Sequence, residues 1–216
     1  MAHVAFTSRA DGDLRIDAPA HELAARRRAV VDLPWSWCRQ VHGAGVEVVT
    51  TPGLPAGAPG DALVTRLSGA ALAVQVADCA PVALVGERAV GVVHVGWRGL
   101  VEGVVPAAVA ALHDLDAGPL VAVIGPCIHP AAYEFGEDAL TAVEAAVGRP
   151  VGGRTAAGGL ALDLPAAVTA ALDGAGVPVE ARVACCTAGS PDVLWSHRAR
   201  GDVARTAVVA WIEEGS

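Results

Sequence analysis

The longest apolar region of the chain spans residues 70–85, and three residues interrupt it: Gln75, Asp78 and Pro81. A membrane-spanning helix needs about 20 predominantly apolar residues without such breaks. Short apolar runs bounded by turn residues are instead typical of buried strands. We therefore expect two buried strands joined by a turn that carries Asp78 and Cys79, and no membrane partner.

Apolar runs elsewhere in the chain extend this pattern. Short runs rich in Val and Ala predict strands, and amphipathic stretches predict three helices. Strands follow one another in the middle of the chain and alternate with helices in its second half. This order favours an α/β fold with a mixed sheet covered by helices. The expected strands are residues 46–51, 71–76, 82–85, 89–95, 120–124, 179–185 and 206–212, and the expected helices are 100–115, 137–147 and 164–172.

A length of 216 residues is long for one domain and short for two. We therefore expect a single domain over residues 1–216. Two stretches rich in Gly and Pro, residues 52–60 and 148–159, are predicted to be surface loops rather than linkers. Hydrophobic residues make up 53% of the chain and aromatic residues 4%, so the core is expected to consist mainly of Ala, Val and Leu.

The charge and the cysteines narrow the classes of partner and compartment. A net charge of −8 argues against a nucleic-acid partner, which would need a clustered basic surface. The amino-terminal residues lack the basic start and apolar middle of a signal peptide. The five cysteines are odd in number and show no CxxC spacing, as expected for free thiols in a reducing compartment. We expect a cytoplasmic protein, either a monomer or a small homo-oligomer.

Two imidazoles and one thiol lie in Gly-bearing turns next to predicted strands. His42 occurs in Gln-Val-His-Gly, Cys79 in Ala-Asp-Cys, and His94 begins His-Val-Gly-Trp-Arg-Gly. Two His and one Cys leave the fourth position of a tetrahedral zinc open for water or substrate. Considered singly, each residue has an ordinary explanation, because a His near a strand is usually structural and a buried Cys is usually inert packing. Together they predict a catalytic zinc site.

The chain also resembles a known family. Four motifs carry the resemblance, in this order: residues 39–43 (RQVHG), 77–82 (ADCAPV), 94–99 (HVGWRG) and 124–128 (IGPCI). They are similar to the laccase-domain family, first described as multicopper polyphenol oxidoreductases and now as purine nucleoside phosphorylases with adenosine deaminase activity. The resemblance extends from about Phe6 to Trp211. It implies a three-layer α/β/α sandwich, and adenosine, inosine, guanosine or methylthioadenosine as substrates together with phosphate.

The chemistry of these reactions predicts roles for residues near the predicted zinc ligands. Cys79 and His94 would take part in catalysis, and zinc would lower the pKa of bound water to about 7, as deamination requires. Asp78 would either carry the proton or hold a ligand histidine in one tautomer. Arg98 would bind phosphate, because its planar guanidinium binds phosphate through two hydrogen bonds and a predicted helix start follows it.

Other matched positions are expected at the substrate. Gln40 and Arg198 would contact it, while Cys127 would form a pocket wall or merely pack. Arg198 and Arg205 lie in elements that resemble the family's, and the resemblance implies phosphate contacts there, although Ala199 and Ala204 depart from the family pattern. His129, His197 and Cys185 depart from the family pattern, and the sequence leaves their roles open.

The histidine count tests the older oxidase description. Four coppers are held mostly by imidazoles in His-x-His pairs, because Cu(II) prefers nitrogen donors. This chain has seven His and no such pair, so we exclude a true laccase. Copper could still occupy the single site adventitiously, since its intrinsic affinity exceeds that of zinc.

Two other classes of function remain open from the residues alone. Cys79 could be the nucleophile and His94 the base of a thiol hydrolase that cleaves an amide in a cell-wall precursor or a modified protein. Alternatively, zinc could only stabilise a non-catalytic partner-binding domain.

Overall fold

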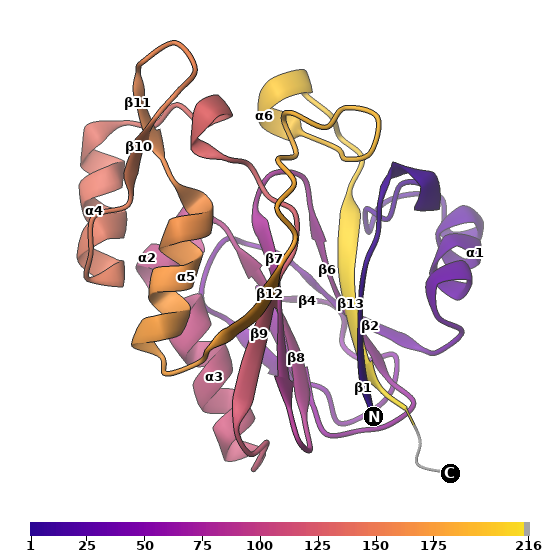
Figure 1. The fold of residues 1–216 in the computed structure, drawn as a ribbon. Helices are drawn as coiled ribbons and strands as arrows, with labels where there is room; N and C mark the ends of the chain where they lie inside the picture. The colour runs from indigo at the N-terminus through magenta and orange to yellow at the C-terminus, as the bar shows by residue number, and fades with distance from the viewer. Residues whose placement is uncertain (214–216) are drawn as a thin grey trace.

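Two mixed β-sheets pack face to face in the computed structural model, which describes residues 1–213, and helices cover the outer faces (Figure 1). The six-stranded sheet has the order β12 (Val179–Arg182), β9 (Leu120–Ile124), β7 (Ala80–Gly86), β8 (Val90–Val95), β5 (Ala62–Thr65), β3 (Val46–Val48). The five-stranded sheet has the order β1 (Ala2–Phe6), β13 (Thr206–Ile212), β6 (Ala71–Val76), β2 (Trp35–Arg39), β4 (Ala56–Pro59). A separate hairpin joins β10 (Gly152–Arg154) and β11 (Leu160–Leu162).

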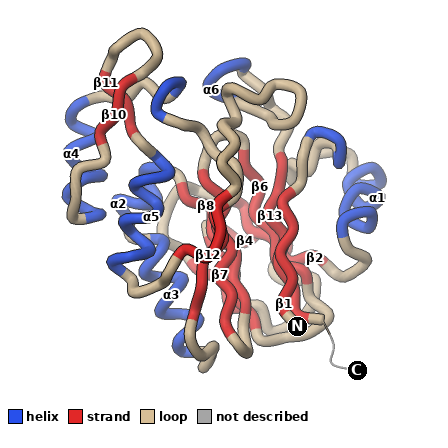
Figure 2. The backbone as a smooth tube through the Cα atoms, in the orientation of Figure 1, coloured by secondary structure: helices blue, strands red, loops and turns tan. Residues whose placement is uncertain are grey.

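The helices lie on both sides of the paired sheets, as the tube view shows (Figure 2). The six-stranded sheet is covered by α2 (Trp97–Glu102), α3 (Val104–Asp114), α4 (Glu137–Val147) and α5 (Leu164–Gly174), and the five-stranded sheet by α1 (Ala20–Val30). A short helix, α6 (His197–Arg200), precedes β13. Within residues 1–213, no helix is long and apolar enough to cross a membrane.

The mixed α/β class is confirmed, but the expected three layers around one sheet are wrong. There are four layers, because the strands divide between two sheets. Small aliphatic side chains such as Leu63 and Val92 of one sheet pack against Leu72 and Val208 of the other. Each fully buried Val or Leu contributes roughly 1.5–3 kcal/mol. A continuous apolar run shows that both faces of a strand are buried, but it does not reveal whether a helix or another sheet covers each face.

The predicted element bounds hold best for the buried strands and long helices. Strands β6, β9 and β13 and helix α4 match their expected ranges. The single helix expected at 100–115 is instead two helices, because Gly103 adopts a left-handed conformation with φ 81° between α2 and α3. Strands β1, β2, β4, β5, β10 and β11 were not predicted, and β4 and β10 lie within the two stretches expected to be loops.

The predicted turn between two buried strands is present, and it connects the two sheets. Strand β6 belongs to the five-stranded sheet and β7 to the six-stranded sheet, so Asp78 and Cys79 lie where the chain passes from one sheet to the other. Strand β8 is antiparallel to β7, and its His94 pairs with Pro81 at the same end. The fold therefore gathers the three predicted motifs at one end of both sheets.

Candidate metal and active site

His42, Cys79 and His94 converge, and their donor atoms all lie within 4.8 Å of one another. Two donors that bind one zinc ion at about 2.0–2.3 Å are separated by at most roughly 4.6 Å. The spacing of the three donors therefore fits one ion after a slight contraction. Cys79 is half-buried, His94 is buried and His42 is exposed, so the fourth position would open toward solvent. Among residues 1–213 this is the one such group of His, Cys, Asp and Glu, and it fits a single metal rather than four coppers.

Asp61 orients the buried histidine. Its carboxylate Oδ1 lies 2.8 Å from Nδ1 of His94, and its backbone oxygen accepts a hydrogen bond from the backbone N–H of His94 at 2.7 Å. Because Nδ1 of His94 is paired with this carboxylate, Nε2 is the ring nitrogen that remains to bind a metal beside Cys79. A carboxylate that fixes the tautomer and ring plane in this way is the usual partner of a metal-binding histidine.

The same carboxylate also shapes the turn that carries His42. Three successive amides donate to it: Val41 at 3.2 Å, His42 at 2.9 Å and Gly43 at 2.8 Å. His42 has φ 61°, in the left-handed region that L residues rarely adopt. Converging amides compensate for this strain and for the complete burial of Asp61. One carboxylate therefore positions two of the three donors.

The electrostatics of the group favour an ionised thiol. Burial opposes ionisation of Cys79, but His94 and His42 outweigh it and lower the pKa of the thiol to about 6. Burial likewise opposes protonation of His94, yet the charges of Cys79 and Asp61 raise its pKa to about 9. For Asp61, burial would raise the pKa, while the hydrogen bonds from His94 and the turn amides lower it. Thiolate is the form of cysteine that binds metal.

Asp78 has a different set of partners from those expected. Its Oδ1 accepts hydrogen bonds from the hydroxyls of Thr187 and Ser196, at 2.5 and 2.7 Å, and its Oδ2 accepts one from the backbone N–H of Arg198 at 2.6 Å. The expectation that it holds a ligand histidine is wrong, because Asp61 does so. Asp78 instead ties the 187–198 segment to the turn of Cys79.

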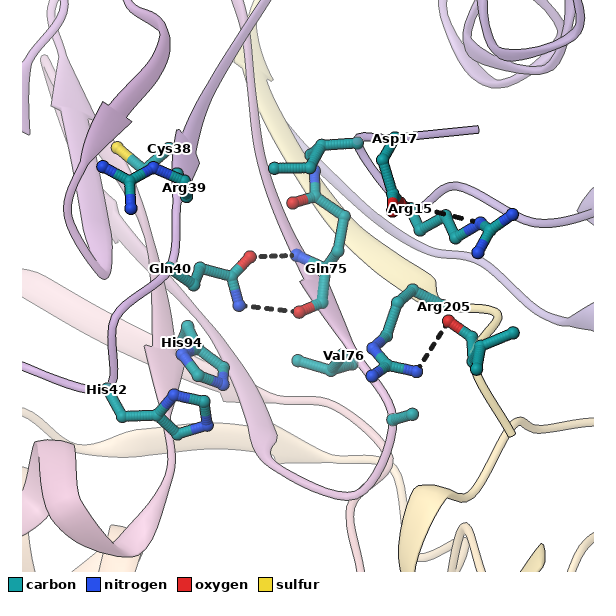
Figure 3. A pocket seen from close by; sticks show the side chains of 13 residues that line it. Arg15, Asp17, Cys38, Arg39, Gln40, His42, Gln75, Val76, His94 and Arg205 are labelled. Carbon is teal, nitrogen blue, oxygen red and sulfur yellow. Dashed lines mark hydrogen bonds and ion pairs between the residues drawn. The ribbon is translucent and has the colours of Figure 1, made fainter. Parts of the chain in front are cut away.

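Gln40 is locked to the end of β6. Its amide nitrogen donates to the backbone oxygen of Gln75 and its amide oxygen accepts from the backbone N–H of Gln75, both at 2.8 Å (Figure 3). The side-chain amide thus makes the two hydrogen bonds that a neighbouring strand would make with Gln75. Gln40 and Gln75 both line a cavity of about 430 Å³. The cavity also reaches His42 and His94, so Gln40 lies beside the metal group, and its contact with substrate stays a prediction.

Arg98 lines a second cavity, of about 450 Å³, which reaches His42 from another side. Its guanidinium lies 4.4 Å from the ring centroid of Trp97. Arg198 lies farther along the site, 5.0 Å from the ring centroid of Tyr133, and donates to the backbone oxygen of Glu134 at 3.2 Å. The helix expected to follow Arg98 instead contains it, because α2 begins at Trp97, and this helix is only six residues long.

Cys127 is buried, and burial together with Cys186 raises the pKa of its thiol to about 12. The backbones of Cys127 and Cys186 form an isolated parallel β-bridge, and both thiols are free. This position favours the interpretation that Cys127 packs in the core rather than contacts substrate. Among the residues that depart from the family pattern, Cys185 lies 3.1 Å from the hydroxyl of Ser190, His129 donates its backbone N–H to the sulfur of Cys186, and His197 begins α6.

Sequence reasoning missed Asp61. The signal available was one acidic residue directly before the apolar run Ala-Leu-Val. A carboxylate in such a position is buried with the strand and needs partners. Its partners, however, are a distant turn and a strand about thirty residues later, which only the fold brings together.

Comparison with known proteins places the chain among relatives. It is 41% identical over 198 residues to a Streptomyces coelicolor protein named purine nucleoside phosphorylase, covering 89% of this chain and 81% of that protein. It is 37% identical to a Streptomyces griseus protein of the same name, covering 98% and 95% of the two chains. The crystal structure of YlmD from Geobacillus stearothermophilus superposes with a TM-score of 0.86 at 27% identity, over 99% of this chain and 92% of that one. The family model described as multi-copper polyphenol oxidoreductase laccase matches residues 5–213, and the chain belongs to this family.

Proposed function

We propose that this protein is a zinc-dependent purine nucleoside phosphorylase that also deaminates adenosine. The observation that carries the proposal is the open group of His42, Cys79 and His94, in which Asp61 fixes the buried histidine. The names of relatives at 37–41% identity support nucleoside phosphorolysis. A donor set of two His and one Cys supports zinc at an open site. Adenosine, inosine, guanosine and methylthioadenosine are the proposed substrates.

Phosphorolysis exchanges one bond at C1′ of the ribose. A phosphate oxygen forms a bond with C1′ while the bond from C1′ to the purine nitrogen breaks. The electron pair leaves with the purine, which takes the proton of hydrogenphosphate, so the products are the free base and ribose 1-phosphate. When bound, zinc would supply a Lewis acid and, for deamination, activated water. Asp61 would keep the ligand histidine in the required tautomer throughout.

Asp78 enters the proposal as the residue that holds the 187–198 segment beside Cys79. The role of proton carrier, expected from the sequence, would require one of its carboxylate oxygens to exchange a partner, because three donors already occupy them. If Asp78 carries the proton, replacing it changes the pH profile of turnover. If Asp78 only holds the 187–198 segment, replacing it lowers the stability of the fold.

One observation favours a second candidate function. Cys79, His94 and Asp61 form a chain of thiol, imidazole and carboxylate, the arrangement that activates a cysteine nucleophile. A thiol hydrolase would, however, have no use for His42, whose turn is fixed by three amide hydrogen bonds. We therefore place this candidate second.

The test is a panel of the four nucleosides incubated with metal-loaded protein, with and without phosphate, and product identification by mass. We expect base release only with phosphate, deamination of adenosine without it, and loss of both after chelation. Activity on amide substrates that survives the chelator would favour the hydrolase. Absence of all these activities, together with a lower melting temperature after chelation, would indicate a non-catalytic domain.

A further inference from the structure

The cavity of about 430 Å³ beside the metal group carries an unusual charge for this acidic chain. Its lining includes His42 and His94 on one side and Arg15, Arg39 and Arg205 around the rest. Arg15 is paired with Asp13 at 2.9 Å and Asp17 at 3.6 Å. Within residues 1–213, no carboxylate pairs with the guanidinium of Arg39 or Arg205, although Asp17 also lines the cavity and Asp13 accepts the backbone N–H of Arg205 at 3.0 Å. Three arginines and one carboxylate in the lining leave an excess of positive charge beside the metal group, which indicates a site for an anion.

Arg205 is held so that one edge of its guanidinium stays free. Its Nη1 donates to the backbone oxygens of Asp202, Val203 and Ala204, each at 2.9 Å. No partner within residues 1–213 binds its Nε or Nη2. These two nitrogens form the side edge of the guanidinium, which matches two oxygens of a phosphate or carboxylate.

The free edge is turned to the side of the cavity on which Val76, His94 and His42 lie (Figure 3). In Figure 3 the hydrogen bond of Arg205 leads to one side, and the remaining nitrogens of its guanidinium face the side of the view where His42 and His94 lie. Strand register explains this position: Thr206 pairs with Val76, so Arg205 lies beside the end of β6, directly before the turn of Cys79. Arg39 contributes charge at the rim, three residues before His42, with its guanidinium turned outward in the same view.

We propose that Arg205 binds the attacking phosphate through the Nε and Nη2 edge of its guanidinium, inside the cavity that reaches His42 and His94. This assignment rests on the proposed phosphorolysis and names the residue that holds its second substrate. The oxygens that Arg205 does not bind include the one that attacks C1′, and the proton of the bound hydrogenphosphate passes to the departing purine.

Arg98 is the competing candidate for phosphate, and the geometry separates the two. It lines the other cavity that reaches His42, and its guanidinium lies over Trp97. Phosphate and base lie on opposite sides of C1′ when one displaces the other. A flat indole and an arginine suit the purine side, whereas the free guanidinium edge of Arg205 in the other cavity suits phosphate.

The kinetic test compares Arg205→Gln and Arg205→Lys with wild-type protein, with Arg66→Gln as the matched control. Arg66 is exposed and follows β5 at the end opposite Asp61, so its replacement makes the same charge change away from the site. Loss of a charge-assisted bidentate contact is expected to raise the phosphate KM about 10- to 100-fold. The nucleoside KM and the phosphate-independent deamination should change less than about threefold. Because Lys keeps the charge but not the planar fork, Arg205→Lys should resemble Arg205→Gln.

These readouts separate binding from folding, since a disturbed fold would also lower deamination and the affinity for nucleoside. If the phosphate KM is unchanged in Arg205→Gln, or if Arg98→Gln raises it more, the assignment is overturned while phosphorolysis stands. Equilibrium dialysis of zinc-loaded protein with labelled orthophosphate tests the site without turnover. Arg205-dependent binding by a protein that performs no phosphorolysis would retain the anion site and overturn the proposed function.

A parallel dialysis with adenosine 5′-monophosphate distinguishes free phosphate from the phosphate of a nucleotide. The assignment expects orthophosphate to bind in the millimolar range or tighter and the nucleotide to compete no better than orthophosphate does. Arg205-dependent binding of the nucleotide alone would overturn the assignment to the attacking phosphate.

Discussion

Replacing Asp61 with Asn tests the claim that one buried carboxylate builds two thirds of the metal site. The side chain is completely buried and accepts four hydrogen bonds, two on each oxygen. The amide nitrogen of Asn, in place of either oxygen, cannot accept a hydrogen bond, so two N–H donors lose their acceptor. Each lost hydrogen bond to a charged group costs about 1.5–3 kcal/mol. The free energy of unfolding of the metal-free protein should therefore fall by roughly 3–6 kcal/mol, a large part of the about 5–15 kcal/mol typical of a folded protein.

Zinc affinity should fall as well, for a separate reason. If the new amide donates to Nδ1 of His94, the ring proton moves to Nε2, which must be free to bind metal. Loss of a hydrogen-bond partner of a ligand typically weakens metal binding 10- to 100-fold, and we expect at least roughly that much. Urea unfolding of chelated protein measures the first effect, and competition with a chelating indicator measures the second.

Asp116→Asn is the matched control, because this carboxylate is exposed and accepts from Arg88 at 2.9 Å. Its φ of 54° suits Asn equally well, so we expect a change within about 0.5 kcal/mol. The pKa of Asp61 is lowered in the folded protein, so its stabilisation is present above the unfolded value of about 3.9 and is lost as the pH falls through the folded value. The difference between wild type and Asp61→Asn should accordingly shrink in acid. A loss below about 1 kcal/mol with unchanged zinc affinity would refute the reasoning.

Four further outcomes follow from the site. Cys79→Ala and His94→Ala should lose stoichiometric zinc on dialysis, measured by elemental analysis, whereas Cys127→Ala should retain it. Gly96→Ala would place a methyl group 3.1 Å from both the Cys79 sulfur and the His42 ring, so zinc affinity should fall roughly 10-fold, measured by competition with an indicator. Gly96 has a φ of −92°, which Ala adopts readily, so the effect would come from the contact and not from backbone strain. In chelated protein, alkylation of Cys79 by iodoacetamide should increase with a midpoint near pH 6, and zinc should suppress it at every pH, as peptide mapping would show. Asp78→Asn should lower the melting temperature yet keep one zinc; an unchanged melting temperature with a shifted pH profile of turnover would instead identify a proton carrier.

The sequence predicted the donors because their chemistry is local. His42, Cys79 and His94 occur in Gly-bearing turns beside apolar runs, and both features are visible in a single sequence. The bounds of β6, β9 and β13 were also predictable, since a Gly, a Pro or a charged residue lies within two residues of each end of these buried runs. Strand β5 was not predicted, because its four residues are too few to show a period.

The partners of the donors could not be predicted, because they depend on register and topology. Asp61 reaches His94 only when β5 pairs with β8. Asp78 is adjacent to a predicted ligand, which made it the obvious partner of a ligand histidine, but its φ of 94° turns it toward the 187–198 segment. Adjacency along the chain predicts that two residues lie close together, but not where their side chains point. The assignment of Asp78 as the partner of a ligand histidine failed because its side chain points elsewhere.

The division of the strands between two sheets has a direct consequence for the active site. Asp61 precedes β5 in the six-stranded sheet, and Arg205 precedes β13 in the five-stranded sheet. His94 lies in β8 of the six-stranded sheet, whereas His42 and Cys79 lie in connections between the two sheets. The buried histidine with its carboxylate and the free guanidinium edge are therefore attached to different sheets, which meet through an interface of small aliphatic side chains. Such an interface is close-packed and yields little, so it fixes the distance between the two halves of the site. The chemistry that we propose needs phosphate and metal to act on the same nucleoside, and neither sheet alone would supply both.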